Sequence, residues 1–384
     1  MGQEAFLWKI ETKRYFGDRN QEVFRQYNIK IYNTYRIRGA FILETDKGLK
    51  LLKNLESSKN RVEFEYALQE HLQNMDYPNI DQYVRNTTGE IITEDTVGNR
   101  FVLKNWFPGE ECNLREEGDV EDAASNLALL HTLLRDLQLE EEQIKFNSYF
   151  NLPDLFEKRN RELKRVRSYI REKRKKNEFE MCYMNCYEEF YQQALEAFKL
   201  LEASNYHNLL ADATEHRHIC HGNYTYHNVI MLKQGKAVQN ITPDFKGDYR
   251  LKKENSEILS AAGIPMPNLN LNMATTNFDK ACVGIQITDL YQFIRKVMEK
   301  NDWDIDFGSR ILDTYNRVLS ISKEEYKLLY ILLLYPEKFW KITNFYYNSK
   351  KSWVPQRNIQ KLMGIQEQGD RKTRFLRCLE NTFH

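Results

Sequence analysis

The stretch HICHGNYTYHNVIM, at residues 218–231, contains side chains whose types and spacing suit phosphoryl chemistry. In phosphoryl transfer to a hydroxyl, an aspartate accepts the alcohol proton and an asparagine further along the loop helps to hold Mg²⁺. Asn228 stands at the position of that asparagine, but Asn223 stands where the aspartate is needed. A carboxamide is not basic near pH 7, so Asn223 cannot act as the base.

Candidate ligands for a metal ion recur in TTNFDKACVGIQITDL, which starts at Thr275. The reaction needs a second aspartate for the metal that bridges the phosphates, and Asn277 takes its place. Asp279 keeps a carboxylate, and on an extended strand it points the same way as Asn277 because it lies two residues later. The metal candidates are therefore Asn228, Asn277 and Asp279.

Residues 1–105 are predicted to form a small α+β lobe. The segment 27–55 is rich in β-branched and aromatic residues and is interrupted at Asp46-Lys47-Gly48, which predicts three antiparallel strands. Helical spacing of apolar residues follows at 57–75, where the two leading serines are candidate caps. A hairpin around Val97-Gly98-Asn99 completes the lobe.

Residues 106–384 are predicted to form a larger, mainly helical lobe. Apolar side chains recur every three or four residues from Ala124 to Leu134, and Ser322 with Glu325 forms a capping box before the helical segment that runs to Trp340. The polar, Gly- and Pro-punctuated residues at about 233–274 are predicted to be an insertion with one short helix.

The composition excludes several classes of function. The 384 residues include 56 Lys or Arg and 55 Asp or Glu, so the net charge of +1 gives no reason to expect nucleic acid or an anionic membrane as a partner. Six scattered cysteines without a C-x-x-C favour a reducing cytosol, and no secretion signal is recognised at the start. The longest apolar run, 328–335, is far shorter than the roughly 20 residues of a membrane-spanning helix.

One segment is locally basic, since residues 158–176 contain 11 Lys or Arg. We interpret it as the solvated face of a helix, with binding to nucleic acid or another acidic partner as the alternative. Cys182 and Cys186 follow on the next predicted helix and are expected to be buried rather than metal ligands, because no histidine partner has suitable spacing.

The two lobes, H-G-x-x-x-x-x-N, N-F-D and D-L together resemble the aminoglycoside phosphotransferase and choline kinase fold, a protein-kinase-like bilobal architecture. Within that superfamily, HGNYTYHNVIML, ATTNFDK, LLYPEKFW and NFYYNSKKSW are similar to spore coat proteins of the CotS kind. The resemblance spans roughly residues 27–376, and LYPEKFWKITNFYYNSKKSW is its most particular part.

The resemblance implies that His221 braces the catalytic loop by hydrogen bonds to backbone or to Asp289. It also implies a site for ATP and Mg²⁺. Lys53 matches the strand lysine that pairs with nucleotide phosphates, whereas Lys50 is a weaker candidate because it faces the other side of the strand. Glu65 matches the glutamate that pairs with this lysine, and Glu63 is an alternative. Asp244 is an alternative to Asn277, because its separation from the catalytic loop is closer to the one usual in the superfamily.

The resemblance also places a nucleotide hinge at FVLKNWFPGE, residues 101–110, which includes Lys104 and Trp106. Backbone groups of this segment would meet the adenine ring. The loop that would cover the phosphates is poor in glycine, since YRIRGA offers Gly39 alone.

We therefore expect a kinase-fold spore coat protein that is catalytically impaired and has a structural or assembly role in sporulation. Its implied partners are other spore coat proteins and a nucleotide, and its implied location is the spore coat after synthesis in the mother-cell cytoplasm. The alternative is an active phosphotransferase of the amino-sugar or choline type, using ATP and Mg²⁺ despite Asn223 and Asn277.

Overall fold

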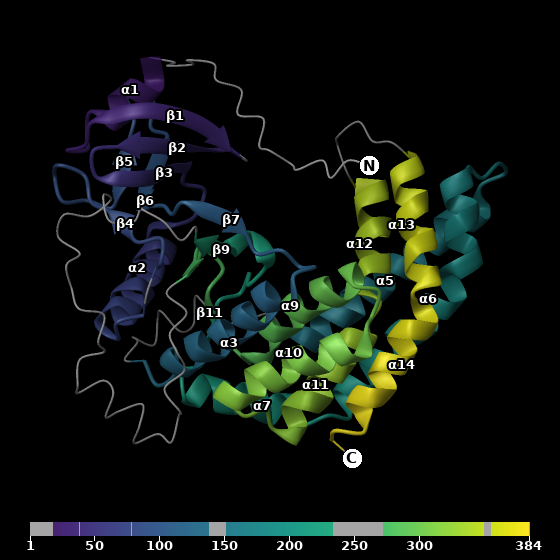
Figure 1. Cartoon of the computed structure of the whole chain (residues 1–384). Coiled ribbons are helices and arrows are strands. Elements are labelled where there is room, and N and C mark those ends of the chain that lie inside the picture. The colour runs from purple at the N-terminus through teal and green to yellow at the C-terminus, as the bar shows by residue number, and fades with distance from the viewer. Residues whose placement is uncertain are drawn as a thin grey trace, which may run out of the picture. The chain divides into compact units, whose positions relative to one another are not determined.

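A computed structural model describes residues 18–37, 39–77, 79–137, 151–232, 272–348 and 355–383. The chain divides into two compact units (Figure 1). The first contains Met1–Cys112 and Tyr226–Asp279, and the second contains Asn113–Thr225 and Lys280–His384. The chain therefore enters each unit twice, and the single boundary near residue 105 stays a prediction.

The first unit is built on an antiparallel sheet of six strands in the order β1-β2-β3-β6-β4, with β5 also paired to β6. These strands are β1 (Ile31–Ile37), β2 (Ala40–Thr45), β3 (Gly48–Asn54), β4 (Tyr83–Val84), β5 (Ile92–Glu94) and β6 (Arg100–Asn105). A second sheet has the order β10-β9-β7 and consists of β7 (Gly109–Glu111), β9 (Val229–Leu232) and β10 (Met273–Thr275). A single 3₁₀ turn, η1 (Tyr226–Asn228), leads into β9.

Two helices cover opposite faces of the six-stranded sheet. Val23 and Phe24 of α1 (Asp18–Phe24) pack with buried side chains that include Leu52 and Leu103. Val62 of α2 (Lys59–Asn74) packs with Val102 on the other face. Side chains alternate along a strand, so successive residues of β3 and β6 point in turn toward α1 and toward α2.

The turns and the helix cap predicted from the sequence are present in this unit. The predicted turn at Asp46–Gly48 joins β2 to β3, and Gly48 has a φ of +82° that glycine adopts without steric cost. Ser58 caps α2 by accepting a hydrogen bond from the backbone N–H of Arg61. The Asp95 carboxylate accepts two backbone N–H groups in the turn between β5 and β6, so the second predicted hairpin is confirmed as well.

The second unit is mainly helical. Its helices are α3 (Glu117–Leu133), α5 (Leu152–Glu172), α6 (Glu178–Glu202), α7 (Tyr206–Glu215), α9 (Ile287–Lys300), α10 (Ile305–Val318), α11 (Lys323–Leu334), α12 (Glu337–Asn348), α13 (Pro355–Glu367) and α14 (Gly369–Glu380). A short ladder joins β8 (Ile219–Cys220) to β11 (Cys282–Val283). The predicted capping box of Ser322 and Glu325 begins α11. The helical segment predicted to run to Trp340 is divided in two, because Pro336 interrupts it: α11 ends at Leu334 and α12 begins at Glu337.

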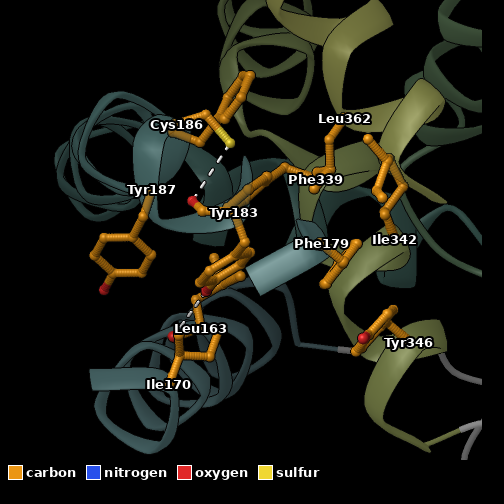
Figure 2. Packing of buried hydrophobic residues seen from close by; sticks show 12 residues of the cluster. Leu163, Ile170, Phe179, Tyr183, Cys186, Tyr187, Phe339, Ile342, Tyr346 and Leu362 are labelled. Carbon is orange, nitrogen blue, oxygen red and sulfur yellow. Dashed lines mark hydrogen bonds between the residues drawn. The ribbon is translucent and has the colours of Figure 1, made fainter. Parts of the chain in front are cut away.

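An aromatic core joins α5, α6, α12 and α13 (Figure 2). Phe179 stacks on Tyr346 with ring centroids 3.7 Å apart, and Tyr183 stacks on Phe339 at 5.1 Å. Cys186 is buried in the same cluster, where burial raises the pKa of its thiol to about 12. The residues 233–271, which hold Asp244 and the predicted short helix, lie outside the described residues.

Candidate functional site

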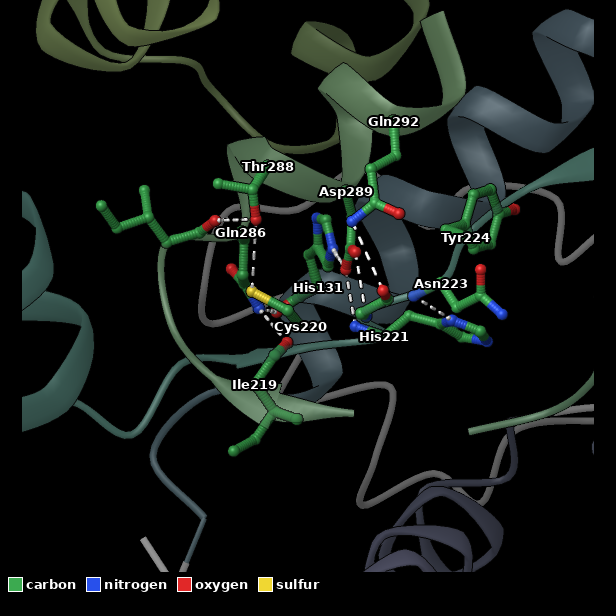
Figure 3. A network of polar contacts seen from close by, with 12 residues as sticks. His131, Ile219, Cys220, His221, Asn223, Tyr224, Gln286, Thr288, Asp289 and Gln292 are labelled. Carbon is green, nitrogen blue, oxygen red and sulfur yellow. Dashed lines mark hydrogen bonds and ion pairs between the residues drawn. The ribbon is translucent and has the colours of Figure 1, made fainter. Parts of the chain in front are cut away.

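The loop after β8 is held by the Asp289 carboxylate from the first turn of α9 (Figure 3). Asp289 Oδ2 accepts the backbone N–H of His221 at 2.6 Å, and Oδ1 accepts that of Gly222 at 2.9 Å. Gly222 has a φ of +74°, and a Cβ there would lie 1.9 Å from the carbonyl oxygen of Lys280. A glycine is therefore required at this point of the loop.

Side chains of the loop complete its anchoring within the second unit. The backbone N–H of Asn223 donates to Nδ1 of the buried His221 ring at 3.3 Å. Tyr224 is fully buried and donates its hydroxyl proton to the carbonyl oxygen of Ala123 at 2.8 Å. The expected brace is thus formed by the main chain of His221 with Asp289, and by the ring of His221 with Asn223.

His131 of α3 is a further member of this network that sequence reasoning missed. Its Nε2 lies 3.2 Å from Asp289 Oδ2 and its Nδ1 lies 2.7 Å from the hydroxyl of Tyr315. Burial lowers the pKa of His131 and so favours the neutral ring, although the Asp289 carboxylate acts to raise this pKa. Its position at helical spacing from Leu127 and Leu134 was the available signal: a histidine on an apolar helix face needs polar partners.

In the first unit, the ammonium of Lys53 contacts two of the predicted metal ligands. Lys53 Nζ donates to Asn277 Oδ1 at 3.2 Å and to Asp279 Oδ2 at 3.4 Å. The Lys53 side chain is 40% exposed and that of Asp279 is 25% exposed. The second oxygen of Asp279, Oδ1, is buried and has no hydrogen-bond partner among the described residues. This carboxylate therefore keeps one oxygen that could bind a cation.

The third predicted ligand, Asn228, lies in the same unit. The backbone carbonyl oxygen of Asn228 accepts hydrogen bonds from the backbone N–H of Thr276 at 2.9 Å and from the Thr276 hydroxyl at 3.3 Å. These bonds connect the end of η1 to the residue before Asn277. The first unit thus contains Lys53, Asn228, Asn277 and Asp279, whereas His221 and Asn223 belong to the second unit.

The expected pair of Glu65 with Lys53 is not formed. Glu65 accepts a hydrogen bond from the ammonium of Lys104 and another, at 2.5 Å, from the hydroxyl of Tyr83. Lys104 comes from β6 and is 5% exposed, and Glu65 comes from α2 and is 3% exposed. The register places Lys104 opposite Leu51 and Lys53 opposite Val102, so both lysines leave the same face of the sheet. The buried Lys104 therefore forms the ion pair with Glu65, and Lys53 contacts Asn277 and Asp279 instead.

Asp81 is a second acid in this buried cluster, and sequence reasoning missed it. Its Oδ2 lies 3.2 Å from Lys104 Nζ and accepts the backbone N–H of Asn277 at 2.9 Å. Burial raises the pKa of Asp81 to about 6, although Lys104 opposes the shift. Burial also acts to lower the pKa of Lys104, but Asp81 and Glu65 outweigh it and raise that pKa. Asn277 has a φ of +67°, which is uncommon for a residue other than glycine. The hydrogen bond from its backbone N–H to Asp81 helps to hold this conformation.

The predicted hinge is used largely for internal pairing. The backbone N–H of Trp106 donates to the carbonyl oxygen of Leu49 at 3.0 Å, and the side chain of Lys104 enters the buried cluster. Lys50, on the other face of β3, donates to Asn105 Oδ1 at 2.9 Å, and burial lowers its pKa to about 8. Contact of adenine with Lys104 or Trp106 stays a prediction.

No preformed cation cage is found in the described part of the chain. Within those residues, no group of three or more His, Cys, Asp or Glu side chains is arranged to hold a metal ion. Likewise, none of the described helices is both long and apolar enough to cross a bilayer.

The fold has many counterparts among solved structures. An aminoglycoside phosphotransferase from Alicyclobacillus acidocaldarius is similar with a TM-score of 0.76 and 16% identity, over 94% of this chain and 96% of that one. A spectinomycin phosphotransferase in complex with ADP and spectinomycin has a TM-score of 0.60 and 9% identity, over 91% of this chain and 93% of that one. The fold is therefore that of the protein-kinase-like phosphotransferases.

Sequence comparison narrows this class to one family. The profile of the family described as "Spore coat putative kinase YutH" matches residues 20–250, and the chain belongs to that family. The spore coat protein S of Bacillus subtilis (strain 168) is 21% identical over 338 residues, which cover 87% of this chain and 85% of that protein. Both findings agree with the coat-protein resemblance of the sequence.

Proposed function

We propose that this protein is a component of the spore coat in which the phosphotransferase fold serves assembly and phosphoryl transfer is impaired. It is made in the mother-cell cytoplasm and acts with other coat proteins. Its family supports the coat assignment. The impairment is supported by the neutral side chains at positions 223 and 277, where the resemblance requires carboxylates.

One contact carries this proposal: Lys53 Nζ donates to the carboxamide oxygen of Asn277 at 3.2 Å. Aspartate at this position would give a second carboxylate beside Asp279, with two negative charges for a divalent ion. An amide supplies one neutral oxygen, which is a weaker ligand for Mg²⁺. The same oxygen also accepts a hydrogen bond from the lysine that would otherwise contact phosphate.

The residues present fit a magnesium nucleotide in part. Asp279 would hold the metal through its unpaired oxygen Oδ1, and Asn228 and Asn277 would add neutral oxygens. When bound, Mg²⁺ would neutralise the phosphate charge. Lys53 would contact phosphate oxygens. Solved relatives in complex with ADP and with AMP support nucleotide binding as part of the proposal.

Steady-state ATP turnover with Mg²⁺ tests the impairment. We expect the wild-type protein to turn over ATP no faster than Lys53→Ala. Turnover well above that control would contradict the proposal. Thermal unfolding with and without ATP and Mg²⁺ tests binding separately, because a ligand at a hundredfold excess over Kd stabilises the fold by about 2.7 kcal/mol.

An active small-molecule phosphotransferase is the second candidate. The buried, unpaired Oδ1 of Asp279 favours it, since one carboxylate remains available for a cation. In that case Asp279→Asn would abolish magnesium-dependent turnover. Added carboxylates at positions 223 and 277 would then raise the rate little.

A further inference from the structure

A basic groove lies on the second unit, beside α12 and α13. It has a volume of about 340 Å³ and is lined by Lys338, Arg357, Gln360, Lys361, Gly364 and Gln368. Three of these side chains are cationic, and the described residues that line the groove include no acid. Its volume is within the range of about 300–1,000 Å³ that is typical of ligand sites.

The groove follows one face of each helix. Arg357, Lys361 and Gly364 recur at steps of four and three residues, which places them on one side of α13. Lys338 and Phe345 are seven residues apart and share a face of α12. The Phe345 side chain is 47% exposed, so an apolar contact accompanies the positive charge on that face.

Two acids near the groove are already paired, and one of them, Glu299, partly neutralises the lining residue Lys338. Glu337 forms ion pairs with Lys341 and Arg295, and it accepts a hydrogen bond from Tyr291. Glu299 lies 2.7 Å from Arg295 and 3.7 Å from Lys338. Arg357 and Lys361 are exposed and have no such acid in the lining.

The walls of the groove are fixed before any partner arrives. Phe339 and Tyr346 anchor α12 in the aromatic core, and Ile359 and Leu362 anchor α13 in the same cluster (Figure 2). A preformed groove does not require ordering of its walls on binding, which lowers the free-energy cost of association. The stretch LYPEKFWKITNFYYNSKKSW, the most particular part of the coat-protein resemblance, includes the whole of α12.

We propose that this groove binds an acidic peptide segment of a protein partner. The 13 residues of α13 make a wall about 20 Å long, which matches about six residues of extended peptide. Residues 337–380 contain ten Lys or Arg and four Asp or Glu, although the whole chain has a net charge of only +1. Carboxylates of the partner would meet Lys338, Arg357 and Lys361, and an apolar side chain would contact Phe345.

This inference deepens the proposed assembly role and rests on it for the class of partner, which is a protein. Double-stranded DNA is the competing acidic ligand. The groove is short, and the exposed aromatic side chain of Phe345 shares the α12 face of the lining residue Lys338, which favours a peptide anchored at one residue.

Fluorescence anisotropy with a labelled hexapeptide of four glutamates and two leucines tests the proposal at about 50 mM salt. The variant Lys338→Gln/Arg357→Gln/Lys361→Gln should bind the peptide at least tenfold more weakly than the wild type. The matched control is Lys164→Gln/Arg165→Gln/Arg171→Gln, which removes the same charge from exposed positions of α5 and should bind within twofold of the wild type.

Hydrogen exchange of the wild-type protein supplies a second measurement that needs no variant. The peptide should slow exchange of backbone amides in α12 and α13. Equal loss of binding in both triple variants, no binding by the wild type, or protection by DNA in place of peptide would overturn the proposal. A nucleotide-induced thermal shift unchanged in the groove variant would separate this site from the one at Lys53.

Discussion

Lys104 of β6, and not Lys53 of β3, forms the ion pair with Glu65 of α2 in the interior of the first unit. Asp81 joins this pair and also accepts the backbone N–H of Asn277. The buried charges therefore have a structural task, because they fix the segment that carries the candidate metal ligands. Lys53 is left partly exposed beside Asn277 and Asp279.

Replacement of Lys104 should be much more destabilising than replacement of Lys53. Lys104→Met leaves the buried Glu65 and Asp81 without their cation, which should cost about 3–5 kcal/mol of unfolding free energy. Lys53→Met breaks a partly exposed pair and should cost less than about 1 kcal/mol. Urea unfolding measures both, and equal losses would contradict the assigned pairing.

The carboxylate of Asp289 should be required for the order of the catalytic-type loop. Asp289→Asn leaves one of the two backbone N–H groups of His221 and Gly222 without its acceptor, so we expect a loss of about 1–3 kcal/mol. Hydrogen exchange at these two amides should also accelerate. Asp306→Asn is the control, because Asp306 is an exposed acid in the first turn of α10. A loop amide that exchanges equally slowly in both variants would exclude the brace.

Gly222 should not tolerate a side chain. Gly222→Ala places a methyl group 1.9 Å from the Lys280 carbonyl oxygen and at a positive φ, so the loop must move or the unit must lose stability. Gly118→Ala is the matched change, since Gly118 lies in α3 with open space at its Cβ and should gain up to about 1 kcal/mol. Thermal unfolding of both variants decides; a neutral Gly222→Ala would argue against this loop geometry.

His131 should make the protein less stable in mild acid. Burial lowers the pKa of His131 in the folded state, so the unfolded chain alone gains a proton as the pH falls below about 6.5. Its contribution to stability is therefore complete above that pH and is lost as the pH falls further. The raised pKa of Asp81 acts in the opposite direction, because the folded state binds a proton below about pH 6.

Comparison of variants separates these two effects. Between about pH 7.5 and 5.5, His131→Gln should lose less unfolding free energy than the wild type. His207→Gln should behave like the wild type, because His207 is exposed. An identical pH dependence of His131→Gln and wild type would show that His131 is not held neutral.

Sequence reasoning predicted features that local chemistry determines. The turn at Asp46–Gly48 and the capping box of Ser322 and Glu325 depend on residues within a few positions of one another. The loop of His221 and Asn223 was recognisable for the same reason, since its residue types and spacing are themselves the signal.

The partners that hold the site were harder to predict because they come from distant parts of the chain. Glu65 and Lys104 are 39 positions apart, and His131 and Asp289 are 158 positions apart. The lysine that pairs with Glu65 was misassigned because Lys53 and Lys104 leave the same face of the sheet, and only the packing of α2 decides between them. Asp81 gave no motif at all, and its role follows from burial beside Lys104.

ATP turnover by the double variant Asn223→Asp/Asn277→Asp is the most direct test of the central claim, that neutral amides disable this phosphotransferase fold. A positioned base alone contributes about 10²–10⁴-fold to a rate, so the variant should gain at least about a hundredfold in magnesium-dependent turnover over the wild type. A wild-type protein that already turns over ATP as fast as the double variant would contradict the claim.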